Sequence, residues 1–161
     1  AAGEIQQAVQ KKDWDLFCKR VDVARVYSYA LDDMLAELKA DGLPEHAIAA
    51  SLVKSIKKEV VKELIRQTEI RFKDGAPASK SLLDKPVKTL TAYAGSSALS
   101  LTDIFKIEEK DGKAIAYVQL EDKDLSRDFI WQVQLEKDVN GLWTATRILN
   151  FKEYLKERMD G

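Results

Sequence analysis

Two aspartates are the side chains of this sequence best suited to acid–base chemistry. Asp103 stands beside Ile104 and Phe105, and Asp128 precedes Phe129, so both are predicted to lie on strands. A carboxyl group held in an apolar cavity has a raised pKa and can act as a general acid or base near neutral pH. Asp128 falls on the polar phase of its strand and is expected to face water, which leaves Asp103 as the candidate base.

Four aromatic residues are candidates to line such a cavity: Tyr27, Tyr29, Tyr117 and Trp131. Together with Asp103 they form the set of candidate pocket-lining residues. Aromatic side chains more often belong to a plain hydrophobic core, and we favour that interpretation. We therefore assign no catalytic residue and keep an isomerase- or dehydratase-like enzyme with a pocket carboxylate as an alternative.

Nucleophilic and metal-ion chemistry have little support in this sequence. His46 is the only histidine and Cys18 the only cysteine, so no histidine pair or His–Cys cluster of the zinc-binding kind can form. His46 follows Pro44 in a predicted first helical turn, where a surface or capping role is the plain interpretation. Free cysteine is usually buried, so we expect Cys18 to pack rather than react. We expect no metal, no cofactor and no disulfide.

Basic residues recur every four positions along one predicted helix, at Lys54, Lys58, Lys62 and Arg66. Such a basic ridge could meet anionic lipid or an acidic partner. Glu59 and Glu63 are interleaved with it and can pair with it, so a solvated helix face is the favoured interpretation. The formal net charge is −1, and no set of stacking aromatic residues accompanies the ridge. We therefore expect no nucleic-acid partner.

The side chains with candidate chemistry depend on strands in the second half of the chain. Phe129, Trp131, Val133 and Leu135 alternate with polar residues, the period-two pattern of a strand with one buried face. Asn-Gly at 140–141 separates this run from a second one that ends near residue 149, which indicates a hairpin. Residues 99–109 and 113–121 flank an Asp-Gly turn in the same way. Four strands joined by short turns predict a sequential antiparallel meander.

The first half of the chain is predicted to be helical. Apolar residues recur every three and four positions from Val23 to Leu38, and Gly42 should end that helix. One long helix is expected over residues 45–72, one or two short helices around Pro86 in residues 79–95, and a terminal helix over residues 151–159. Helices over 4–94 followed by a sheet over 99–149 predict one α+β domain spanning residues 1–161. In it the N-terminal helices pack on a curved four-stranded antiparallel meander.

Short helices around Asp13-Trp14-Asp15 and a last strand that opens Gly141-Leu142-Trp143 carry a family resemblance. In this order of elements the chain resembles the nuclear-transport-factor-2-like (cystatin-like) cone superfamily. It is similar in particular to bacterial extracytoplasmic domains of unknown function. Trp14 and Trp143 match the superfamily pattern, whereas the long helical part and the extra helix at Phe151 depart from it. The superfamily includes isomerases, dehydratases and non-catalytic binding modules, so the resemblance implies a fold and no single function.

The resemblance favours an extracytoplasmic location, periplasmic or cell-surface, over a cytoplasmic one. No apolar run approaches the roughly 20 residues that span a bilayer, so no transmembrane segment is expected, and no signal peptide is visible. The sequence opens with Ala1-Ala2-Gly3 rather than Met, which leaves open removal of a signal, removal of an anchor, or an artificial boundary.

Three hypotheses about function follow. The first is a non-catalytic cone-like domain that binds a small ligand or a protein partner, as part of an exported or membrane-anchored bacterial protein. The second is the enzyme with Asp103 as base, which a cavity holding Asp103 beside a tyrosine hydroxyl would favour. The third is a structural dimerisation domain, in which the outer face of the sheet forms a homodimer.

Overall fold

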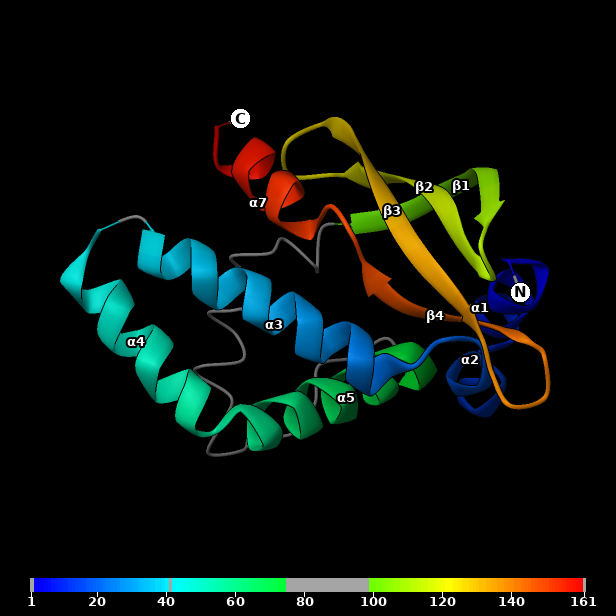
Figure 1. The fold of residues 1–161 in the computed structure, drawn as a ribbon, viewed down its shortest axis with the longest axis horizontal. Helices are drawn as coiled ribbons and strands as arrows, with labels where there is room; N and C mark the ends of the chain where they lie inside the picture. Colours follow the sequence, from blue (N-terminus) through cyan, green and yellow to red (C-terminus); the bar gives the residue numbers. More distant parts are fainter. Residues whose placement is uncertain (1, 41, 75–98, 161) are drawn as a thin grey trace.

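The computed structural model describes residues 2–40, 42–74 and 99–160. Helices form the first part of the chain, four strands follow, and a helix closes it, which confirms the predicted α+β class (Figure 1). The elements are α1 (Ala2–Lys11), α2 (Trp14–Arg20), α3 (Val23–Ala40), α4 (Pro44–Ser55), α5 (Lys57–Asp74), β1 (Leu99–Lys110), β2 (Lys113–Asp122), β3 (Arg127–Lys137), β4 (Trp143–Ile148) and α7 (Phe151–Asp160). The short helices expected in residues 79–95 lie outside the described residues. Among the described residues, no helix is both long and apolar enough to cross a bilayer.

The strands form the predicted antiparallel meander in the order β1-β2-β3-β4. Asp111 and Gly112 both have positive φ, 55° and 77°, as a two-residue hairpin turn of type I′ requires. The second hairpin uses a longer loop, in which only Gly141 has positive φ (77°). There the Asp138 carboxylate accepts the backbone N–H groups of Asn140 (2.8 Å) and Leu142 (3.0 Å), so a side chain organises the turn.

The sheet is bent by three irregularities in its pairing. Two register shifts fall in β1, between Leu101 and Asp103 and between Ile104 and Lys106. The third lies in the β3–β4 pairing, where Gln134 and Leu135 pair with Arg147 and Ala145 and leave Thr146 of β4 as the extra residue. An extra residue on one strand increases the local twist and bends the strand. The helices pack on the inner face of the bent sheet, which is not closed into a barrel (Figure 1).

The main core lies between α3, α5, α7 and one end of the sheet. Phe129 of β3 is buried there and meets the ring of Tyr154 edge-on, with centroids 5.0 Å apart. Trp131 contacts Tyr154 (5.4 Å) and Phe151 (6.0 Å) of α7. A second, smaller cluster at the other end of the sheet contains buried Leu135. The predicted inward phase of β3 is therefore confirmed.

The single helix predicted over residues 45–72 is wrong, because the chain breaks at Ile56 into α4 and α5. Ile56 has φ −116° and ψ 27°, outside the helical region, and its N–H bonds to the carbonyl of Val53. Ser55 adds a side-chain bond from Oγ to the carbonyl of Leu52 (2.7 Å), which competes with the helical pattern. The break lets α4 and α5 meet at an angle while both contact α3 (Figure 1).

Candidate functional site

An apolar cavity of about 240 Å³ lies between the inner face of the sheet and the N-terminal helices. All four strands contribute to its floor, through Ile104, Ala116, Val118, Trp131, Val133, Leu135, Ala145 and Ile148. Several of these side chains are only half-buried, so the cavity is open to solvent. Concave, mostly apolar hollows of this kind are where small ligands usually bind.

The cavity exists because the inner face of the sheet changes from large to small side chains along its length. At the α7 end, Phe129 and the aromatic residues of that helix fill the space. At the other end, Ala116 of β2 and Ala145 of β4 present only methyl groups. No described helix fills the space above these alanines.

Three helices and the α2–α3 junction form the wall opposite the sheet, through Ile5, Phe17, Val21 and Val26. The ring of Phe17 packs on Trp14 (5.6 Å) and on Phe72 of α5 (5.1 Å), which holds α2 in place.

The junction between α2 and α3 is fixed to β4. Val21 forms a parallel bridge to Ala145, and the N–H of Asp22 donates to the carbonyl of Ala145 (2.8 Å). These backbone contacts fix the α2–α3 junction against β4 at Ala145, where the floor of the cavity carries only a methyl side chain.

The described lining of the cavity carries no carboxylate, imidazole, thiol or ammonium group. Contacts with a ligand would therefore be dispersion contacts and the removal of apolar surface from water. The indole of Trp131 is the lining side chain with a polar atom, and its Nε1 is buried without a hydrogen-bond partner. The described residues also contain no group of three or more potential metal ligands.

Of the five candidate pocket-lining residues, Trp131 lines this cavity. Tyr27 and Tyr29 lie on α3 and are not part of its lining. The hydroxyl of Tyr27 is hydrogen-bonded to Thr68 of α5, and burial raises the pKa of Tyr27. The ring of Tyr29 lies 4.5 Å from the guanidinium of Arg147.

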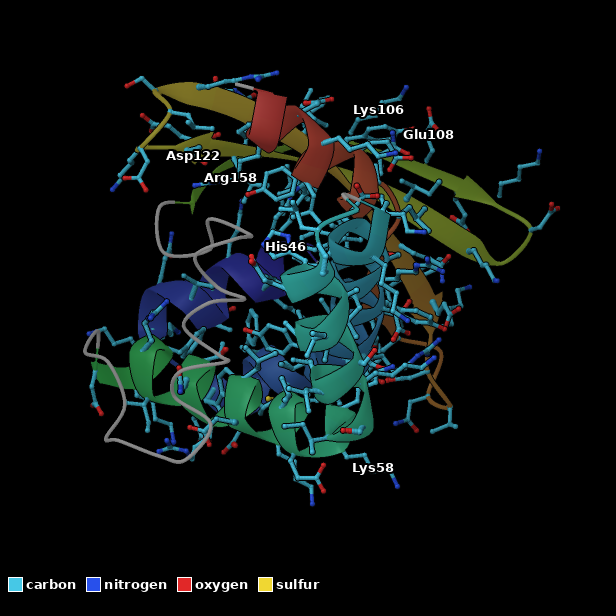
Figure 2. The ribbon with its side chains drawn as sticks, turned by 90° about the vertical axis from the view of Figure 1, so that its left-hand side faces the viewer. His46, Lys58, Lys106, Glu108, Asp122 and Arg158 are labelled. Carbon is cyan, nitrogen blue, oxygen red and sulfur yellow. The ribbon has the colours of Figure 1, made fainter. Side chains whose placement is uncertain are left out.

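Tyr117 and Asp103 lie on the sheet away from the cavity. Tyr117 donates a hydrogen bond to Glu108 (3.2 Å), which Figure 2 shows on the side of the sheet opposite the helices. Asp103 is exposed and stands opposite Gln119 in the β1–β2 register. The described lining thus does not bring Asp103 beside a tyrosine hydroxyl. Asp128 is exposed, as its strand phase predicts.

Three carboxylates are buried that the sequence did not mark for burial: Asp33, Glu63 and Asp122. Asp122, the last residue of β2, is fully buried and accepts the N–H groups of Asp124 (3.0 Å) and Leu125 (3.1 Å). An aspartate that accepts N–H groups two and three residues ahead is a known turn signal, and this signal was available in the sequence. Arg158 of α7 lies beside the same carboxylate (Figure 2).

Asp33 is a second buried carboxylate, on the inner side of α3. Burial raises its pKa, while Arg147, 3.9 Å away, and Lys152 oppose the rise. Its neighbour Asp32 is exposed and pairs with Lys57 (2.8 Å). Two adjacent aspartates look alike in sequence, so no signal marked one of them for burial.

The expectation that Cys18 is packed is wrong, because its side chain is exposed. On the short helix α2, Trp14 and Phe17 face the other helices. The neighbouring side chain of Cys18 faces solvent. Partial burial, together with the carboxylates of Glu69 and Asp15, raises the pKa of the Cys18 thiol. A raised pKa lowers the thiolate fraction, which disfavours a nucleophilic role.

The basic ridge is divided by the break between α4 and α5, so it does not follow one helix. Lys54, Lys58 and Lys62 are exposed, as a solvated face predicts. Arg66 pairs with Glu63 (2.5 Å), but Glu63 is buried, so the solvated face does not extend to this pair. His46 is half-buried in the first turn of α4 (Figure 2).

The chain matches no protein-family model, no curated protein and no solved structure. What the domain does must therefore be inferred from its own residues, and the cavity is the feature with the clearest physical meaning.

Proposed function

We propose that this domain is a non-catalytic binding module that holds a small apolar molecule in the cavity between the sheet and helices α1 to α3. The observation that carries the proposal is a hollow of about 240 Å³ whose described walls are hydrophobic on every side. A protein that needed only a core would fill this space with larger side chains, since protein interiors are normally close-packed.

The lining defines the ligand chemistry. No charged group is available among the described lining residues to pair with an ion, so the inserted part of the ligand is a hydrocarbon group. Burial of one methylene contributes about 0.8 kcal/mol, and association opposes this by several kcal/mol. A chain of roughly eight to ten carbons therefore binds with about millimolar affinity.

The proposal keeps the domain among the cone-shaped nuclear-transport-factor-2-like proteins that its sequence resembles, as part of an exported or membrane-anchored bacterial protein. A bent antiparallel sheet with helices on its inner face supports that placement. The ligand is then a molecule of the envelope or of the medium outside the cytoplasm.

Fluorescence titration with the neutral probe N-phenyl-1-naphthylamine tests the proposal directly. The probe should bind with a blue-shifted emission, and decanol should displace it. Ala116→Phe fills the floor of the cavity and should abolish binding, and Val118→Phe serves as a second filling variant. Ala47→Phe, the same change at an exposed position of α4, is the matched control and should bind as the wild type does.

Circular dichroism and the melting temperature show whether each variant is folded. If either filling variant is folded and still binds the probe as tightly as the wild type does, the cavity is not the binding site. If the wild type does not bind the probe, the proposal is also refuted.

A further inference from the structure

Strand β1 forms one edge of the sheet. It pairs with β2 on one side, and no described strand pairs with its other side. Two large apolar side chains on this edge stay exposed: Phe105 keeps 48% and Ile107 keeps 53% of its surface in contact with water. An exposed edge strand is a template for pairing with another chain.

The hairpin turn determines which backbone groups of β1 are free. In the two-residue turn at Asp111 and Gly112, the carbonyl of Lys110 accepts the N–H of Lys113. Because backbone groups of successive residues point to opposite sides of a strand, Glu108 and Lys106 also bond to β2. The N–H and C=O groups of Ile107 and Glu109 therefore point outward from the free edge.

This alternation restricts how two copies of β1 can pair about a two-fold axis. Only outward-pointing residues can face each other in a hydrogen-bonded pair, so the permitted registers differ by two residues. With Ile107 on the axis, Lys106 of each copy stands opposite Glu108 of the other. The adjacent permitted registers place Lys106 opposite Lys106 or Glu108 opposite Glu108, and like charges directly opposite are destabilising.

We propose that two copies of this chain associate through β1, antiparallel and with Ile107 on the two-fold axis. The occupant of the free edge is a second copy because the charges of the edge are complementary to themselves in this one register. Lys106 and Glu108 already form an ion pair within the strand, 2.6 Å apart, on the outer face of the sheet (Figure 2). Pairing extends it into a four-charge network and brings the two Ile107 side chains together.

The interface is small, since it uses one strand from each copy. Interfaces below the standard size give weak, concentration-dependent association. Sedimentation velocity of the wild type from about 10 µM to about 500 µM should therefore show a shift from monomer to dimer.

Charge reversal tests the register. Lys106→Glu and Glu108→Lys each bring like charges opposite each other, and each should weaken self-association at least about tenfold. An equimolar mixture of the two variants restores unlike charges at both contacts, so the mixture should form a heterodimer. Lys58→Glu and Glu59→Lys, at neighbouring exposed positions of α5, are the matched controls. Figure 2 shows Lys58 far from Lys106 and Glu108.

A covalent probe adds a second readout. In a Cys18→Ser background, Ile107→Cys places two thiols on the axis, and mild oxidation should give a disulfide-linked dimer at low micromolar concentration. Lys113→Cys, at an exposed position of the partner strand β2, should stay monomeric under the same conditions.

A wild type that stays monomeric at the highest concentration would overturn the proposal. A dimer that persists unchanged in both charge-reversal variants would also overturn it, and would point to another surface such as the outer face of the sheet. Cross-linking through Ile107→Cys together with heterodimer formation in the mixture would establish it.

Discussion

Arg158 Nε of the terminal helix lies 3.1 Å from Oδ2 of Asp122, a carboxylate with no exposure to solvent. The other oxygen of Asp122 accepts two backbone N–H groups of the turn that follows β2. One side chain therefore organises the β2–β3 connection and ties it to α7, which covers the aromatic end of the sheet.

Removal of the cation should destabilise this end of the molecule. Arg158→Leu leaves the Asp122 carboxylate buried without its counter-charge, and the free energy of unfolding should fall by about 3 kcal/mol. Urea denaturation measures the change. Arg127→Leu is the control, because Arg127 pairs with exposed Glu157 at 3.6 Å and exposed pairs contribute about 0–1 kcal/mol. Equal effects of the two substitutions would contradict the structural role of Asp122.

Asp33 should make stability depend on pH in an unusual direction. Burial raises its pKa in the folded protein above that of the unfolded chain, so the folded state binds the proton more tightly. The contribution to stability is complete below the unfolded pKa of about 3.9 and is lost as pH rises through the folded pKa.

Asp33→Asn mimics the protonated carboxyl group and should remove this dependence. The variant should be at least as stable as the wild type at neutral pH, and the difference should shrink towards pH 4. Thermal melts between these pH values measure it. Asp32→Asn is the control at an exposed position and should leave the pH profile in place. A neutral-pH loss of stability in Asp33→Asn would show that the ion pair with Arg147 outweighs the burial.

The affinity of the cavity for alcohols should grow with chain length. Each additional methylene contributes about 0.8 kcal/mol, so the dissociation constant should fall about fourfold per carbon until the cavity is full. Competition with the fluorescent probe measures the series from hexanol to dodecanol. Ala145→Leu should reduce the volume of the cavity. In that variant the gain in affinity per methylene should stop at a shorter alcohol. A constant gain through the longest alcohol in that variant would place the binding site elsewhere.

The turn between β1 and β2 should depend on glycine. Gly112 has φ +77°, and no atom lies within 4 Å of the position of an added Cβ, so only backbone strain opposes a side chain. Gly112→Ala should therefore reduce the free energy of unfolding by about 1 kcal/mol. Gly3→Ala, in helix α1 with equally open space, should be neutral or slightly stabilising. Chemical denaturation of both variants distinguishes strain from loss of space.

The local patterns of the chain determined the order and type of its elements. The alternation along Phe129 to Leu135 and the Asp-Gly turn specify strands and a hairpin, because both depend on residues close together in sequence. The same holds for the amphipathic stripe of α3 and for Gly42, which ends it with φ 75°. The α+β meander could therefore be predicted.

Only the tertiary structure decided where the chain is hollow and which polar groups are buried. Ala116 and Ala145 lie on different strands, and whether the space above them is filled depends on where α1, α2 and α3 pack. The break at Ile56 allows α4 and α5 both to contact α3. Asp33 rather than Asp32 is buried because it lies on the face of α3 that is turned to β4. These outcomes depend on contacts between residues far apart in the chain. The periodicity of apolar and polar residues along the sequence carries no information about which distant residues meet.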